Sequence, residues 1–134
     1  MREALCTSIC GRTILTAIDA LAQRLATSPG LPADTEGPVF EEPWQAQAFA
    51  LAVHLHAAGA FSWSDWARAL SACLNAADTR GGVKSASAYY ECWLTALEQI
   101  VVARGVTGAP ALAARKSAWI DAYRRTPHGQ PVTL

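Results

Sequence analysis

Histidine and cysteine side chains are the residues of this sequence best suited to metal chemistry, and their spacing decides whether they can act together. His54 and His56 lie two positions apart in an apolar segment. On a helix, two positions are about 200° apart around the axis, so these imidazoles diverge and cannot share a metal ion. Cys6 and Cys10 lie four positions apart, and on a helix both thiols could hold a soft metal ion. No histidine or third cysteine lies close by in sequence, so this pair is a weak metal-ligand candidate, with a packing role as the alternative.

The remaining reactive side chains indicate structure rather than catalysis. Cys73 and Cys92 fall on or beside apolar stripes with helical spacing, which is typical of buried cysteines. Glu41 and Glu42 form an acidic pair, but they directly precede Pro43, where carboxylates favour the positive end of a helix. The sequence has no nucleophile elbow, no glycine-rich phosphate loop and no convincing cysteine–histidine pair. We therefore expect no catalytic residue and no stably bound cofactor in this chain.

Composition limits the class of protein. The chain has 134 residues, enough for one domain, and 51% of them are hydrophobic. Lysine plus arginine equals aspartate plus glutamate at 11 each, so a basic surface for nucleic acid is not expected. No apolar run approaches the roughly 18 residues of a membrane helix, and the N-terminus lacks a signal-peptide layout, so no membrane association is expected. Four scattered cysteines indicate a reducing environment, and we expect a cytoplasmic protein.

Apolar residues recur with helical spacing almost everywhere, which predicts a single all-α domain of about five helices and no sheet. A first helix from Cys10 and a linker rich in proline and glycine make up residues 1–39. The helical domain proper is expected over residues 40–134, and "TPHGQPVTL" is expected to be its extended tail. The helices expected in this part run from Pro43 to near Gly59, from Ser62 to the loop "DTRGGVKS", from about Ala86 to Arg104, and over residues 108–125.

Local signals mark where these helices begin and which side faces inward. Ser62 followed by Asp65 is an approximate capping box, and Thr107 is expected to cap the fifth helix. The residues of that fifth helix expected to point into the core are Leu112, Trp119 and Tyr123.

The second helix is hydrophobic on more than one face. One face carries Trp44, Ala48, Leu51 and Leu55. Phe49 and Val53 lie roughly opposite, with His56 near them. Two interpretations stay open: the helix is central and buried all round, or its second face contacts another protein chain.

Four stretches, in this order along the chain, resemble one known family. They read "GPVFEEPWQAQAFAL", "GAFSWSDWARAL", "YYECWLTALE" and "TPHGQPV". Together they resemble the small nitrile hydratase accessory proteins, also called activators, which are related to the helical N-terminal part of the nitrile hydratase β subunit. Similar proteins serve thiocyanate hydrolase. The resemblance covers about residues 37–134 and says nothing of residues 1–36.

The resemblance implies an accessory role. Proteins of this family bind the metal-bearing α subunit of a nitrile hydratase, promote metal insertion and then yield their place to the β subunit. The α subunits carry a Cys-x-x-Cys-Ser-Cys motif that this sequence lacks, so the metal is expected in the client and not here. Some iron-type activators have cysteine-rich motifs that are also absent, which favours cobalt over iron in the client.

Three further possibilities remain at this stage. The chain could be a permanent small β-type subunit of a nitrile hydratase or thiocyanate hydrolase. It could also be a plain structural bundle without such a partner, and it could form a homodimer. For the accessory role, the partner-binding residues are predicted on the second and third helices and in the tail. They are Trp44, Phe49, Val53, His56, Trp63, Trp66, Thr126, Pro127, His128, Gly129, Gln130 and Pro131.

Overall fold

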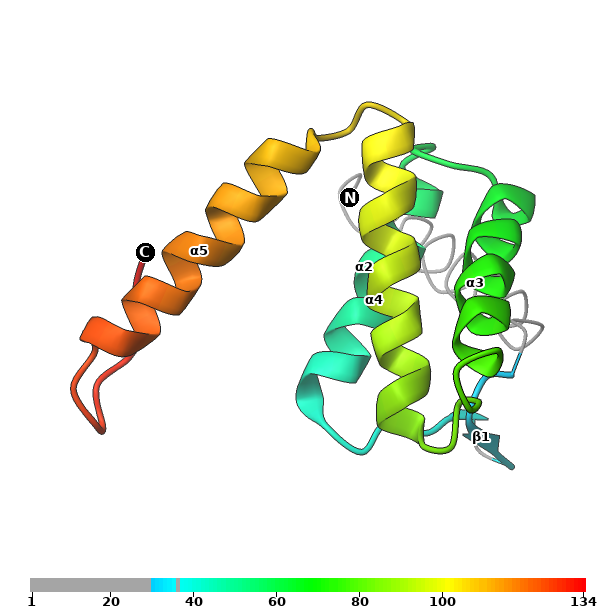
Figure 1. Cartoon of the computed structure of the whole chain (residues 1–134), viewed down its shortest axis with the longest axis horizontal. Coiled ribbons are helices and arrows are strands. Elements are labelled where there is room, and N and C mark those ends of the chain that lie inside the picture. Colours follow the sequence, from blue (N-terminus) through cyan, green and yellow to red (C-terminus); the bar gives the residue numbers. More distant parts are fainter. Residues whose placement is uncertain (1–29, 36) are drawn as a thin grey trace, which may run out of the picture.

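The computed structural model describes residues 30–35 and 37–134, and most of its regular structure is helical. Two short strands come first, β1 (Ala33–Asp34) and β2 (Gly37–Pro38), and they pair antiparallel. Four helices follow in this part of the chain (Figure 1): α2 (Pro43–Ala57), α3 (Trp63–Asp78), α4 (Ala86–Ala103) and α5 (Ala109–Arg125). The helix predicted from Cys10, and with it the pair Cys6 and Cys10, lies outside the described residues.

The all-α prediction is confirmed, with one local difference. The four helices lie close to the bounds that the sequence predicts. The two strands are not expected from the sequence, but each has only two residues. They form where the proline- and glycine-rich segment reverses direction, and beside them Val39 N donates to Pro32 O at 2.9 Å. An extended chain that turns back can satisfy its backbone groups by pairing with itself, so the ladder is a local turn and not a layer of the fold.

Two helix starts test the predicted caps. At α3, Ser62 Oγ accepts from Asp65 N at 3.2 Å and Asp65 Oδ2 accepts from Ser62 N at 3.4 Å, which confirms the capping box. At α5 the N-cap is Gly108, so the prediction of Thr107 is wrong by one residue. A cap at Thr107 would make Gly108 the first helical residue, and glycine is a poor helix former. The helix therefore begins at Ala109.

The core of the described bundle lies around α4, which packs against α3 on one side and α2 on the other. The indoles of Trp66 and Trp93 meet in its centre with ring centroids 4.8 Å apart. Trp93 Nε1 also donates to Ala48 O at 3.2 Å, which ties α4 to the backbone of α2. Ala48 and Ala52 are buried at this contact, and their small side chains allow the two helices to approach closely.

The apolar residues on the two faces of α2 pack mostly against other parts of the bundle. Phe49 stacks on Trp93, with ring centroids 5.4 Å apart and planes at 23°, and its edge meets Phe40. On the other flank, Trp44 and Leu55 are half-buried and pack against the same core. Apart from Leu51, which is 49% exposed, the large apolar residues on both flanks of α2 therefore have partners within this chain, which supports the interpretation that the helix is largely buried.

α5 is arranged differently from the other helices. It leaves the end of α4 and points away from the bundle as an arm (Figure 1). The turn before it contains Gly105 at φ +69°, a left-handed conformation that favours glycine. Leu112, in the first half of the arm, is half-buried against the core. The rest of α5 contributes little to the packing of α2, α3 and α4.

Candidate partner-binding surface

The partner-binding residues predicted on α2 and α3 mostly pack against other residues of the bundle. Trp66 has no exposed surface, so the structure places it in the core and not on an outer face. Phe49 and Val53 are half-buried and pack against that core. Trp63 is also half-buried, and its ring meets the edge of His56 at a centroid distance of 5.7 Å. Trp66 is therefore not accessible to a partner, and Phe49, Val53 and Trp63 are only partly accessible.

The two histidines of α2 have separate surroundings, in line with their spacing. His56 Nδ1 lies 2.9 Å from Phe61 O, and its ring also lies against the Phe61 ring. This contact closes the turn between α2 and α3, where Gly59 takes φ +81°. His54 is exposed on the opposite side of the helix. His56 therefore joins two helices, and the pair does not form a metal site.

The C-terminal tail folds back along α5 and does not extend away from it (Figure 1). Gly129 at φ +83° makes the reversal, and Gln130 N donates to Pro127 O at 3.1 Å. Thr126 Oγ1 donates to Ala122 O at 2.7 Å, and Ala122 is buried. The tail residues predicted to bind a partner are exposed apart from the half-buried Thr126: they are Pro127, His128, Gly129, Gln130 and Pro131.

The largest apolar side chains left open on α5 lie on one helical face. Trp119, Ile120 and Tyr123 have exposed fractions of 42%, 44% and 68%. The sequence predicts Trp119 and Tyr123 as inward-facing, and for the described bundle this is wrong, because the turn after α4 directs the arm outward. Leu112 lies on the same face and is the member of the set that does pack against the core. We call Leu112, Trp119, Ile120 and Tyr123 the α5 stripe.

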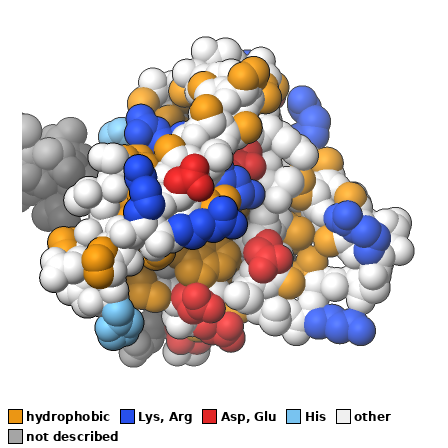
Figure 2. Space-filling model, turned by 60° about the vertical axis from the view of Figure 1, so that its left-hand side comes forward, with side chains coloured by type: hydrophobic (Ala, Val, Ile, Leu, Met, Phe, Trp, Pro, Cys, Tyr) orange, Lys and Arg blue, Asp and Glu red, His pale blue; other side chains and the backbone are white. Residues whose placement is uncertain are grey.

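The α5 stripe continues into a groove between α4 and α5. The groove has a volume of about 530 Å³, and most of its exposed lining is apolar. Val102 and Ala103 line it from α4, and Leu112 and Ala113 line it from α5. The side of the molecule that carries α5 shows apolar side chains between basic and acidic ones (Figure 2). The sequence predicts Leu112, Trp119 and Tyr123 as core residues, so it does not indicate this surface, and it gives no role to Ile120.

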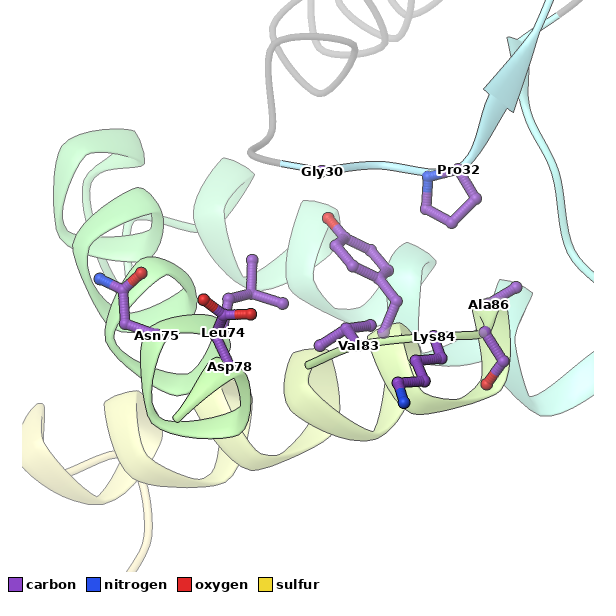
Figure 3. Close-up of a pocket in the computed structure, with 10 residues that line it drawn as sticks. Gly30, Pro32, Leu74, Asn75, Asp78, Val83, Lys84 and Ala86 are labelled. Atoms are coloured by element: carbon purple, nitrogen blue, oxygen red, sulfur yellow. The ribbon is translucent and has the colours of Figure 1, made fainter. Parts of the chain in front are cut away.

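A second pocket of about 530 Å³ lies near the start of α4 (Figure 3). Its lining combines apolar groups such as Leu74 and Tyr89 with the charged side chains of Asp78 and Lys84. Burial raises the pKa of the Tyr89 hydroxyl, a group that is already neutral near pH 7 at its ordinary pKa. Among the described residues, neither a histidine nor a cysteine lines the pocket, and none of the described lining residues is a nucleophile beside a base. The described lining of this pocket therefore does not indicate a catalytic site.

Cys73 and Cys92 lie on facing helices and line an open pocket of about 440 Å³. Cys73 Sγ donates to Gln99 Oε1 at 3.6 Å, and Cys92 Sγ lies 4.0 Å from Cys73 O. Burial raises the pKa of both thiols, so neither is an activated thiolate. Both cysteines pack between α3 and α4, consistent with the structural role predicted for them.

Within residues 30–35 and 37–134, no group of three or more histidine, cysteine, aspartate or glutamate side chains is arranged to hold a metal ion. No helix in the same residues has the length and apolar character required to cross a membrane.

Comparison with known proteins supplies the family. The family described as "Nitrile hydratase beta subunit, N-terminal" matches residues 22–132, which includes all four described helices and most of the tail. Comparison with curated proteins and with solved structures gave no match. Because the family match spans most of the sequence, the chain belongs to the family of the nitrile hydratase β subunit N-terminal region.

Proposed function

We propose that this chain is an accessory protein that binds the α-type subunit of a nitrile hydratase or a thiocyanate hydrolase. It assists the insertion of cobalt, or alternatively iron, into that subunit and then gives up its place to the β subunit. The chain itself is non-catalytic, and the metal is a component of the client. The family match over residues 22–132 carries this proposal, because it relates the chain to a region of an enzyme subunit.

The geometry of the described bundle supports a binding role. A catalytic site needs a nucleophile, a base or a metal within reach of a substrate. The two pockets with reactive side chains at their edges contain thiols whose pKa is raised and a tyrosine whose pKa is raised, which are poor catalysts near pH 7. By contrast, the exposed α5 stripe and the groove beside it have the apolar character typical of the centre of a protein–protein interface.

Assembly with a client can be tested directly. The full chain is co-expressed in cobalt medium with a cobalt-type nitrile hydratase α subunit, and complexes are purified through a tag on the α subunit. We expect the chain to co-purify and the cobalt content of the α subunit to rise relative to α subunit expressed alone. If the chain neither co-purifies nor changes the cobalt content, the accessory role is contradicted.

A second candidate is a permanent small β-type subunit of the enzyme, and the same family match favours it. The two roles differ in stoichiometry after the β subunit is added. An accessory protein leaves when α and β assemble, whereas a permanent subunit remains in the active complex. Native mass spectrometry of the assembled enzyme, before and after addition of the β subunit, separates these outcomes.

A further inference from the structure

The α5 stripe is an apolar helix face without a partner in the described structure. Trp119, Ile120 and Tyr123 occupy one side of the arm, and each is more than 40% exposed. An isolated helix of this length is only marginally stable in water, so such a face is stabilised when another surface covers it. Large aromatic side chains with exposed surface are also the residues that most often dominate binding at interfaces.

The chain does not cover this face with its own C-terminus. The tail returns along the side of α5 marked by Ala122 and Arg125, with which Pro127 and Pro131 line a small pocket. Ala122 lies about 60° around the helix from Trp119 and about 160° from Ile120, so the tail borders the stripe and leaves its far side open. The exposed fractions of the stripe residues are those that remain with the tail in place.

The charged side chains around the α5 stripe indicate which kind of partner could cover it. Of the four basic side chains of α5, Arg115 and Arg124 lie about 40° beyond the two edges of the stripe and Lys116 lines the groove, whereas Arg125 lies beside the tail. The carboxylates are fewer: Asp121 on α5, and Glu98, which lines the groove from α4. Two copies that paired through α5 would bring like charges together across the interface, which is unfavourable. A partner with an apolar ridge bordered by carboxylates would instead match both the stripe and its basic surroundings.

We infer that the α5 stripe and the adjoining groove form the docking surface for the α-type subunit, which inserts an apolar segment bordered by carboxylates. This inference rests on the proposed function and assigns to it a surface other than the α2 face that the sequence suggests. Trp119 is the central anchor, because it combines the largest side chain of the stripe with a position between Leu112 and Tyr123.

A matched pair of variants tests the surface. Trp119→Glu places a carboxylate on the stripe, and Ala114→Glu places one at an exposed position of the same helix, about 120–180° around the axis from every stripe residue. Binding of each full-length chain to a purified cobalt-type nitrile hydratase α subunit is measured by calorimetry. We expect Trp119→Glu to weaken binding by about 30-fold, the effect of losing an interface anchor, and Ala114→Glu to bind like the parent. Tyr123→Ala, which adds no charge, should weaken binding in the same direction.

A spectroscopic measurement locates the contact without a disruptive substitution. The parent chain is labelled with 5-fluorotryptophan at its five tryptophans, and the Trp119 resonance is assigned by its loss in Trp119→Phe. Adding unlabelled α subunit should shift that resonance most, while the resonance of the buried Trp66 should change little.

The outcomes separate the inference from the proposed function. If the parent chain does not bind the α subunit, both are overturned. If the parent binds but Trp119→Glu and Tyr123→Ala bind equally well and the Trp119 resonance does not move, the docking surface is wrong and the function stands. If the Trp119 resonance instead moves with the concentration of the chain alone, and sedimentation shows a dimer that Trp119→Glu dissociates, a second copy occupies the stripe and the inference is overturned.

Discussion

At the scale of single residues, the two central tryptophans differ in one interaction. Trp66 and Trp93 are both fully buried and touch each other. Trp93 Nε1 donates to Ala48 O at 3.2 Å, whereas Trp66 Nε1 is buried without a hydrogen-bond partner. A buried donor without a partner carries a desolvation cost that a satisfied donor does not. The two side chains are therefore a natural pair for measuring what the link between α4 and α2 contributes.

Replacing each tryptophan by phenylalanine removes similar volume but only one hydrogen bond. We expect Trp93→Phe to lower the free energy of unfolding by about 1 kcal/mol more than Trp66→Phe does. Urea unfolding followed by circular dichroism measures both values. Equal losses in the two variants would show that the bond to Ala48 adds nothing to stability.

At the scale of elements, the start of α3 combines a cap with an ion pair between helices. Ser62 and Asp65 exchange the capping bonds, and Arg104 at the end of α4 pairs with the same carboxylate. The Ser62 hydroxyl donates to Asp65 Oδ2 at 2.6 Å and holds the pKa of that carboxyl below its usual value, with a smaller effect from Arg104. The start of α3 is thus linked to the end of α4.

Removing the cap should weaken this element. Ser62→Ala should cost about 1 kcal/mol of unfolding free energy, because Asp65 N loses its acceptor at the helix start. Ser117→Ala is the control, since Ser117 is exposed within α5, away from this cap, and its substitution should change the unfolding free energy by less than about 0.5 kcal/mol. Thermal unfolding of the two variants checks the difference, and equal midpoints would contradict the role of the cap.

The same carboxyl predicts the direction of an acid effect. Because folding lowers the pKa of Asp65, the folded chain binds a proton there less tightly than the unfolded chain does. Its contribution to stability is therefore present above about pH 4 and is lost as the pH falls through the lowered pKa. In Asp65→Asn this part of the acid-induced loss should disappear.

The helices themselves could be predicted because their signals are local. Apolar spacing and the Ser62–Asp65 box act within a few residues, and the structure follows them. The direction of α5 could not be predicted in the same way. The stripe of Leu112, Trp119 and Tyr123 has the spacing of a core-facing helix, but spacing does not say which surface the helix meets. In the structure, α5 follows a turn in which Gly105 has φ +69°, and the larger residues of the stripe are left exposed.

The location of the candidate partner-binding surface also could not be predicted from apolar spacing alone. The residues of α2 that suggest an interface are apolar on both flanks, and the structure uses both flanks to contact Trp93 and its neighbours. The largest group of exposed apolar side chains lies instead on α5, whereas Leu51 on α2 and Leu94 on α4 are exposed singly. Only the arrangement of the helices in space distinguishes these two locations.

At the scale of the whole molecule, the described residues divide into a packed bundle and an arm. α2, α3 and α4 enclose the core, and α5 contacts it chiefly through Leu112 (Figure 1). An arm held at one end can present its apolar stripe to a large partner while the bundle keeps its own packing. Binding and folding should then depend on different parts of the chain.

Removing residues 109–134 should therefore leave a folded bundle that no longer binds the α subunit. The truncated chain loses the contact of Leu112 with the core, so its unfolding free energy should fall by about 1–2 kcal/mol, the value for a partly buried leucine. Leu112→Ala in the full-length chain should account for most of the same loss while it retains the exposed end of the stripe. Thermal unfolding and calorimetric titration of both variants against the α subunit measure stability and binding separately. A truncated chain that no longer unfolds cooperatively would show that α5 is required for the core, and a truncated chain that still binds like the parent would place the partner on the bundle.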